Sequence, residues 1–230
     1  MRRGDFGVEV FPTSGADVRE LDSGHILARP GTVYRLRLRN FGPLYAVVAV
    51  EIDGRTVTAG GLALRPWSYT DLERPVDAGE TGRFTVAAEG DEPVFGPDGG
   101  RDNDALGLIH ASFRRELPSG RTRPELPDGF SIQRSTFSRG TYSHPAPTSI
   151  DAIMAPGRVR SEPFGDIERA AGTGLTGHSD QQFVPATLGP LEDEATVIQL
   201  RLVIGSDAAI AAAPAATIQD PAPARPAARP

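Results

Sequence analysis

Alternating apolar and polar residues are clearest in residues 32–39 (TVYRLRLR). Tyr34, Leu36 and Leu38 share one side of an extended chain there, and three arginines share the other. A period of two is typical of a strand with one buried face and one wet face. The segment therefore predicts a strand whose outer face is rich in arginine.

Six further segments have the apolar and β-branched composition of strands. Residues 45–52 (YAVVAVEI) form a dense apolar run, which predicts a strand covered on both faces. Residues 105–114 contain Gly107, which we interpret as the site of a β-bulge. The remaining expected strands are residues 55–58, 69–76, 83–88 and 197–204.

Turn signals separate these segments at intervals of about ten residues. Residues 40–43 (NFGP) have the length of a hairpin connection. Asp53-Gly54 predicts a tight primed turn, because glycine tolerates a positive φ. The 26 Gly and 21 Pro among 230 residues disfavour long helices. The pattern predicts an all-β fold, an antiparallel, jelly-roll-like β-sandwich.

Two segments interrupt this rhythm. Residues 117–166 are rich in Pro, Ser, Gly and Arg, and only short pieces such as 130–132 resemble strands. So long an irregular stretch is typically functional or ordered by a partner. The Ala/Pro-rich end predicts a short helix at 207–213 and then an extended arm. We divide the chain into a discontinuous β-sandwich (1–114 and 167–205), an irregular insert (115–166) and a tail (206–230).

Composition and charge exclude several kinds of site. The chain has no cysteine, and so no disulfide, thiolate nucleophile or cysteine-bound metal. All 24 basic residues are arginine, which either a GC-rich genome or selection for bidentate carboxylate contacts would explain. The net charge of −6 argues against a nucleic-acid partner. No secretory signal or membrane-length apolar run is visible, which predicts a soluble protein made in the cytoplasm without membrane contact.

Residues 172–177 (GTGLTG) match the G-x-G-x-x-G pattern of dinucleotide-binding loops. That chemistry requires a strand before the motif and a helix after it, and neither IERAA nor HSDQQF fits these positions. We therefore expect no cofactor. We interpret Gly172, Gly174 and Gly177 as a glycine loop with unusual backbone angles.

His178, Ser179 and Asp180 are adjacent and invite comparison with a catalytic triad. Consecutive side chains do not converge on one proton path, because a fold brings the members of a triad together. The sequence thus predicts that the protein is not an enzyme, and a hydrolase is the disfavoured alternative. The other histidines lack the i, i+4 spacing of metal ligands: His25, His110 and His144.

Asp98, Asp102, Asn103 and Asp104 lie in a glycine-rich segment (GPDGGRDNDALG). Oxygen ligands in such a segment suit Ca²⁺, which makes the three aspartates weak metal candidates. Their spacing is not that of an EF-hand, and the glutamate at the twelfth position is missing. We favour an acidic turn between strands and expect no metal.

Trp67, the only tryptophan, and Tyr69 lie in the run RPWSY. Two such aromatic residues beside a proline are typical of an interface anchor or a sugar-stacking platform. A side chain that covers the core at a sheet edge also explains Trp67 and is the interpretation that we favour. At residues 73–75 (ERP) we expect an ion pair at the end of a strand, because proline cannot donate to a ladder.

Several short motifs follow one another in a recognisable order. They are residues 34–40 (YRLRLRN), 50–57 (VEIDGRTV), 71–76 (DLERPV), 83–86 (RFTV), 172–183 (GTGLTGHSDQQF) and 197–203 (VIQLRLV). Their order resembles a group of small β-sandwich proteins encoded by double-stranded DNA viruses, phages and some bacterial genomes. The similarity covers residues 32–114 and 172–204, and it departs from the group at the RPW segment and the proline-rich tail.

The resemblance implies a virion-associated structural module and names no catalytic residue. We therefore expect a non-enzymatic virion structural protein (a minor capsid, head-decoration or spike-base component), assembled in the host cytoplasm. Its expected partners are other virion proteins and further copies of itself, because a partner surface offsets the ordering cost of irregular segments.

A carbohydrate- or receptor-binding module is the second hypothesis, with Trp67 and Tyr69 stacking on a glycan.

The glycine segment at residues 172–177 is expected to hold the irregular insert against the sandwich. The interaction residues that we expect are Trp67, Tyr69, Gly172, Gly174, Gly177 and Phe183.

Overall fold

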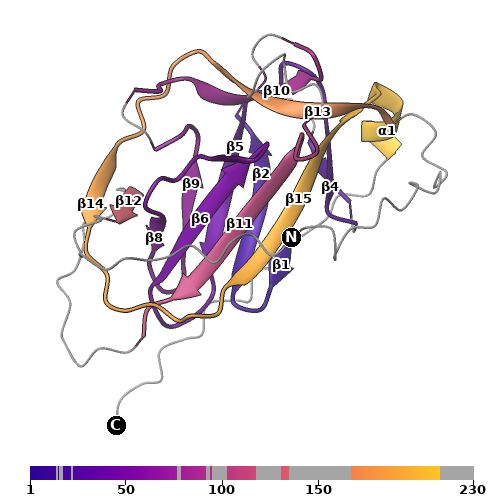
Figure 1. The fold of residues 1–230 in the computed structure, drawn as a ribbon. Coiled ribbons are helices and arrows are strands. Elements are labelled where there is room, and N and C mark those ends of the chain that lie inside the picture. The colour runs from indigo at the N-terminus through magenta and orange to yellow at the C-terminus, as the bar shows by residue number, and fades with distance from the viewer. Residues whose placement is uncertain are drawn as a thin grey trace.

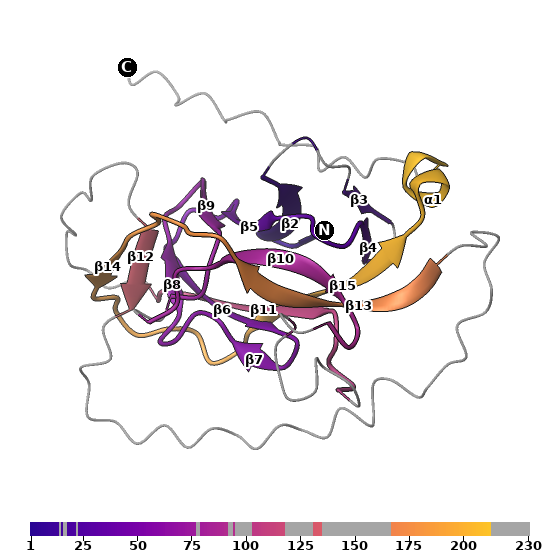
Figure 2. The same cartoon turned by 90° about the horizontal axis from the view of Figure 1, so that it is seen from above.

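The computed structural model describes residues 1–13, 15, 18–21, 23–76, 79–91, 94, 103–117, 131–134 and 167–212. These residues form fifteen strands and one short helix, which confirms the predicted all-β fold (Figure 1). A four-stranded and an eleven-stranded sheet pack face to face as a β-sandwich (Figure 2). No helix in this part of the chain has the length and apolar character needed to cross a membrane.

The smaller sheet has the order β1-β2-β5-β9: β1 (Arg2–Arg3), β2 (Phe6–Pro12), β5 (Tyr34–Asn40) and β9 (Ser68–Leu72). The path of the larger sheet is β10 (Arg83–Ala88), β13 (Ile167–Thr176), β15 (Thr196–Gly205), β11 (Leu108–Arg115), β6 (Ala46–Ile52), β8 (Leu62–Leu64), β12 (Ser131–Arg134) and β14 (Phe183–Ala186). Three short strands attach beside this path: β3 (Arg19–Glu20), β4 (His25–Ala28) and β7 (Arg55–Thr56).

The sandwich is not purely antiparallel. β4 pairs in parallel with β15, and β12 pairs in parallel with β14. These pairs join segments far apart in the sequence, such as His25 with Arg201, so local patterns carry no sign of them. The chain before residue 32, for which the sequence located no strands, supplies β1 to β4.

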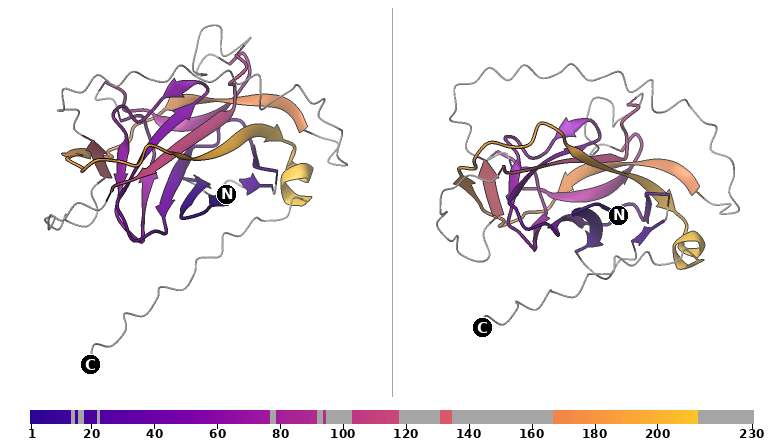
Figure 3. Two further views of the ribbon diagram at one scale, coloured as in Figure 1. Left: turned by 60° about the horizontal axis from the view of Figure 1, so that its bottom comes forward. Right: turned by 90° about the horizontal axis from the view of Figure 1, so that it is seen from below.

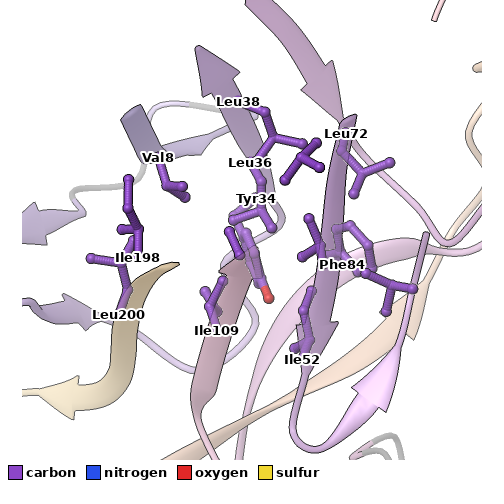
Figure 4. Packing of buried hydrophobic residues seen from close by; sticks show 14 of the residues in the cluster. Val8, Tyr34, Leu36, Leu38, Ile52, Leu72, Phe84, Ile109, Ile198 and Leu200 are labelled. Carbon is purple, nitrogen blue, oxygen red and sulfur yellow. The ribbon is translucent and has the colours of Figure 1, made fainter. Parts of the chain in front are cut away.

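The core lies between the two sheets. Tyr34, Leu36 and Leu38 of β5 are fully buried, and the arginines between them lie on the outer face, as the alternation predicts. Ile109 and Leu200 of the larger sheet belong to the same cluster (Figure 4). Burying each of these large side chains contributes about 1.5–3 kcal/mol, which makes β5 a major source of stability.

The strand expected at residues 45–52 is covered on both faces only in its first half. Val47 packs against Ala63 and Leu188 on the outer side of the larger sheet, whereas Ala49 and Glu51 are exposed. The chain around Leu188 reaches only the beginning of β6, so the rest of the strand has one wet face.

The connection at residues 40–43 is not a hairpin. β5 pairs with β2 and β9, and β6 pairs with β7, β8 and β11, so this connection carries the chain from one sheet to the other. The buried side chain of Asn40 holds the crossing. Its Nδ2 donates to the carbonyls of Leu44 (2.8 Å) and Arg65 (3.0 Å), and its Oδ1 accepts from the Gly42 N–H (2.9 Å).

Asp53 and Gly54 form the predicted tight turn, with φ values of 54° and 78°. Two successive residues with positive φ are the mark of a primed hairpin turn, and β6 and β7 pair antiparallel across it. β7 ends at Thr56 and is shorter than the expected strand at 55–58.

β9 ends at Leu72, so the strand expected at 69–76 is too long, whereas β10 has the predicted bounds. The expected bulge at Gly107 is also wrong. Gly107 precedes β11 with a φ of 75°, and a Cβ there would lie 2.5 Å from the Ala171 carbonyl oxygen and 2.6 Å from that of Leu202. Glycine is required because three segments of backbone meet at this point.

The glycine motif is part of a strand and not a loop. β13 runs as far as Thr176 and pairs antiparallel with β10, with Ala87 opposite Gly172. A Cβ at Gly172 would lie 2.6 Å from Leu106 Cδ1, which explains a glycine in a strand. Of the three motif glycines, Gly177 alone has a positive φ, 63°, so the expected unusual backbone is confined to it.

The last strand and the short helix lie where the sequence predicts them. β15 contains the strand expected at 197–204, and α1 (Asp207–Ala212) confirms the short helix, with Ile210 buried against Val203. β12 extends the short ordered piece expected at 130–132. Views from other sides place α1 and the β12–β14 pair at opposite ends of the molecule (Figure 3). Most of the predicted insert and the tail beyond residue 212 lie outside the described residues.

Candidate interaction surface

The outer face of the four-stranded sheet carries arginine, aromatic and carboxylate side chains. In the register of β2, β5 and β9, Arg37 lies between Glu9 and Asp71, and Arg39 lies beside Tyr69. Because side chains alternate along a strand, these residues point away from the core. We call this surface the arginine–aromatic face. Its strand residues are Arg2, Glu9, Phe11, Arg35, Arg37, Arg39, Tyr69 and Asp71, and Phe41, just after β5, joins them because its ring lies against Arg2 and Arg39.

Guanidinium groups and rings alternate across this face. The guanidinium carbon of Arg37 lies 4.7 Å from the ring centre of Phe11 and 4.1 Å from that of Tyr69. Arg39 lies 5.4 Å from Tyr69 and 6.0 Å from Phe41. The guanidinium carbon of Arg2 lies 4.2 Å from the ring centre of Phe41. Rings and guanidinium groups therefore follow one another across the face in the order Phe11, Arg37, Tyr69, Arg39, Phe41, Arg2. Each such contact contributes about 0.5–1 kcal/mol at an exposed site, so the series holds its side chains in place.

Two carboxylates neutralise part of the positive charge. Arg37 donates from Nε (2.7 Å) and Nη2 (2.9 Å) to the two oxygens of Asp71, and this hydrogen bonding raises the pKa of Arg37. Arg39 donates to Glu9 at 2.5 Å. Arg35 shares Asp71 at 3.3 Å, and its Nε is buried without a hydrogen-bond partner. Four arginines and two carboxylates give the face a formal charge of +2, whereas the formal net charge of the whole chain is −6.

Trp67 and Tyr69 are the most exposed large apolar side chains among the described residues, at 68% and 52%. The favoured interpretation, that Trp67 covers the core, is therefore wrong. Trp67 has a φ of 54° in the turn before β9, and its N–H donates to the Gly42 carbonyl at 3.2 Å. A left-handed backbone costs a bulky L-residue about 1–2 kcal/mol, so the fold imposes this conformation and directs the ring to solvent.

The segment that follows β13 binds the outer edge of β9. Gln181 donates from Nε2 to the Asp71 carbonyl (2.5 Å) and accepts from the Glu73 N–H at Oε1 (3.0 Å). A neighbouring strand would make the same two kinds of bond, so this amide covers the edge. Arg74 donates to the Gln181 carbonyl from Nη2 (2.6 Å) and lies 4.9 Å from the Phe183 ring centre. The ion pair expected within 73–75 is therefore replaced by these contacts.

The other predicted interaction residues have smaller exposed surfaces or none. Gly172 and Gly174 are buried within β13, Gly177 is an exposed turn residue, and Phe183 is half-buried beneath Arg74. Trp67 and Tyr69 are thus the predicted interaction residues that present large side chains to solvent.

The three adjacent residues of the apparent triad have separate partners. The Ser179 hydroxyl is buried and donates to Glu73 at 3.1 Å. His178 is exposed, and its Nε2 lies 3.1 Å from an oxygen of Asp180. The serine and the histidine therefore do not form the nucleophile–base pair of a triad.

The remaining histidines do not come together in the part of the chain that the structure describes. His25 bonds to the Ser23 hydroxyl at 2.9 Å, and burial lowers its pKa. His110 lies 3.9 Å from the Glu51 carboxylate. His144 lies outside the described residues.

The predicted cation loop is only partly described. Asp98 and Asp102 lie outside the described residues, and Asp104 is exposed. Asn103 donates from Nδ2 to the Asp53 carbonyl at 3.0 Å, which ties this segment to the turn after β6. Within the described ranges, no three His, Cys, Asp or Glu side chains gather as they would around a metal ion.

Asp53 forms a buried polar site that sequence reasoning missed. Its two carboxylate oxygens accept from the N–H groups of Gly107 and Thr173, both at 2.6 Å. The Thr173 hydroxyl bonds in turn to the buried Tyr34 hydroxyl at 2.7 Å. Burial raises the pKa of Asp53 to about 6, although both N–H donors act in the opposite direction. An Asp before a Gly predicts a turn, and only the tertiary fold determines that its carboxylate is buried.

Comparison of the chain with protein-family models, with curated proteins and with solved structures gives no match. The viral family resemblance therefore stays a prediction from sequence. Residues 71–76 and 172–183, which carry part of that resemblance, contact each other through Gln181 and Arg74.

Proposed function

We propose that the chain is a non-enzymatic structural protein of a virion, a minor capsid, head-decoration or spike-base component, that acts through protein–protein contacts. The observation that best supports contact-based function is the exposure of Trp67 and of Tyr69, whose ring lies against the guanidinium group of Arg37. Trp, Tyr and Arg supply most of the energy at protein interfaces. Side chains already held in one geometry lose little further entropy on binding.

The hydrogen bond of Ser179, the serine of the apparent triad, is in keeping with a binding role. Its hydroxyl donates to Glu73 and not to a histidine, so this bond stabilises the fold. The virion assignment itself rests on the motif order and on the Pro/Ala-rich arm, which suits a chain that orders on its neighbours.

Quantifying the chain in purified virus particles tests this proposal. We expect a fixed copy number relative to the major shell protein, retained after washing in salt. A chain found only as a free monomer in infected-cell extract would exclude a structural role.

A carbohydrate-binding module is the second candidate, and the exposed ring of Trp67 is the observation that favours it. Aromatic rings stack on the apolar faces of sugars, and the adjacent Tyr69 would extend such a platform. In this case the isolated chain should be retained on immobilised glycans, and Trp67→Ala should abolish retention without changing the melting temperature. Equal retention of the two proteins would contradict it.

A further inference from the structure

The first half of β15 has an open edge. Arg201 is paired with β11 on one side and with β4 on the other, and its N–H donates to the carbonyl of the residue before β4 at 3.0 Å. Over residues 196–200, β11 is the one strand that pairs with β15 in the part of the chain that the structure describes. Alternate residues of a strand direct their backbone groups to the same edge, so those of Gln199 and Val197 point to the side that β4 leaves open.

The sequence of this open edge favours strand pairing. Residues 196–200 (TVIQL) contain no charge, proline or glycine, and three of the five are β-branched. Exposed edges of this kind pair with other chains unless charged side chains, prolines or covering groups protect them. Two other edges of this fold have such protection, because the Gln181 amide covers β9 and β14 contains Pro185.

A side chain from the smaller sheet lies on the open edge of β15. Arg3, the last residue of β1, donates from Nη1 to the Val197 carbonyl at 3.0 Å, and this contact is exposed to solvent. β1 contacts β15 at the side of the sandwich (Figure 1). Arg3 itself is exposed, so core packing does not explain a long charged side chain here. Its guanidinium group occupies a carbonyl to which an added strand would bond.

We infer that Arg3 prevents the open edge of β15 from pairing with the same edge of a second copy of the chain. Two such edges are complementary, because antiparallel strands related by a two-fold axis exchange N–H···O=C bonds between equivalent residues. Arg3 occupies the Val197 carbonyl, and pairing would also bring the two Arg3 guanidinium groups together near the axis, where they repel each other. This inference goes beyond the proposed function and does not depend on it.

Removal of the Arg3 charge from the full chain tests the inference. Arg3→Thr introduces a β-branched residue that suits a strand, and the control Arg29→Thr removes another exposed arginine, which pairs with Asp207. In sedimentation equilibrium we expect Arg3→Thr to form dimers with a dissociation constant at least about tenfold below those of the wild type and the control. Hydrogen exchange at Val197 and Gln199 should slow only in the associated Arg3→Thr protein, because the new bonds form at this edge.

Two further variants separate charge, hydrogen bonding and folding. Arg3→Gln keeps a donor for the Val197 carbonyl without the charge, so it should associate more tightly than the wild type, and it replaces Arg3→Thr if that variant does not fold. Adding the exposed substitution Gln199→Lys to Arg3→Thr returns a charge to the edge and should restore the wild-type dissociation constant. Equal dissociation constants for Arg3→Thr and Arg29→Thr would overturn the inference. Arg3→Gln that associates no more than the wild type, or dimers with unchanged exchange at Val197, would overturn it as well.

Discussion

At the scale of single residues, Asp53 links the turn after β6 to two other segments. Its carboxylate receives N–H groups from Gly107, just before β11, and from Thr173 in β13. Thr173 extends the network to Tyr34, which stacks on Phe84 in the core at 5.7 Å. One short side chain therefore joins segments 54 and 120 residues away in the sequence.

Replacing this carboxylate by an amide should destabilise the fold. Asp53→Asn preserves size and tolerates a positive φ, but it turns an NH₂ group toward one of two backbone N–H donors. One buried donor then loses its acceptor, which costs about 1–3 kcal/mol. Urea unfolding at neutral pH measures this cost. Equal unfolding midpoints and slopes for the two proteins would show that the two hydrogen bonds do not support the fold.

The same residue should make stability depend on pH. The fold raises the pKa of Asp53 from 3.8 to about 6, so the native state binds the proton more tightly than the unfolded chain. Its contribution, about 3 kcal/mol, is fully present below about pH 4 and is lost as pH rises through about 6. We expect the free energy of unfolding of the wild type, measured in urea between about pH 4 and 7, to rise relative to that of Asp53→Asn as the pH falls. Parallel pH profiles would refute a raised pKa.

Gly107 and Gly177 provide a matched pair for testing close backbone contact. Both have positive φ, but a Cβ at Gly107 meets two carbonyl oxygens, whereas at Gly177 nothing lies within 4 Å. Gly177→Ala should therefore cost about 1 kcal/mol, the strain of the backbone alone. Gly107→Ala should cost more than about 3 kcal/mol or prevent folding. Calorimetry of both variants decides this, and similar melting temperatures would mean that the close contact relaxes at little cost.

At the scale of elements, the sequence predicts the strands whose pattern is local. The alternation in β5 and the apolar composition of β10 and β15 lead to bounds within two residues of those observed. The primed turn at residues 53–54 is also predictable, because its backbone angles depend on the two residues themselves. The path of the chain after β5 is not predictable from the sequence, because a short connection can either close a hairpin or cross from one sheet to the other.

The glycine motif shows why local rules fail at a crowded site. Glycine is depleted in strands, so three glycines within six residues favour a loop. In β13 the surroundings reverse this preference, because Leu106 and Val94 occupy the space that a side chain at Gly172 would need. Both neighbours come from distant parts of the chain, and their approach leaves no periodic signal in the sequence.

Gln181 allows a test at this scale. Gln181→Ala removes the amide that bonds to the carbonyl of Asp71 and the N–H of Glu73 at the edge of β9. We expect a loss of about 1–2 kcal/mol, because both backbone groups are partly buried. The exposed neighbour gives the control: Gln182→Ala should stay within about 0.5 kcal/mol of wild type. Chemical unfolding gives the free energy of unfolding of both variants. An equal loss of stability in the two would show that the Gln181 amide does not protect the edge of β9.

At the scale of the whole molecule, the two sheets differ in what they do. The larger sheet gathers β4, β13 and β15 from both ends of the chain and contains the parallel pairs (Figure 3). The smaller sheet presents the arginine–aromatic face. The sequence predicts the arginine row on this face, but it does not predict the exposure of Trp67, because the turn before β9 sets the direction of that ring.

If the protein acts in an assembly as proposed, we expect the arginine–aromatic face, and Trp67 in the turn before β9, to be covered when the protein is assembled. Hydroxyl-radical footprinting of isolated and assembled chains tests it at Trp67 and Tyr69, with exposed Leu117 and Val184 as internal references. We expect the oxidation of Trp67 and Tyr69 to fall severalfold on assembly while the reference residues change little, because interface rings lose solvent contact. Unchanged oxidation of Trp67 in the assembled protein would contradict the claim.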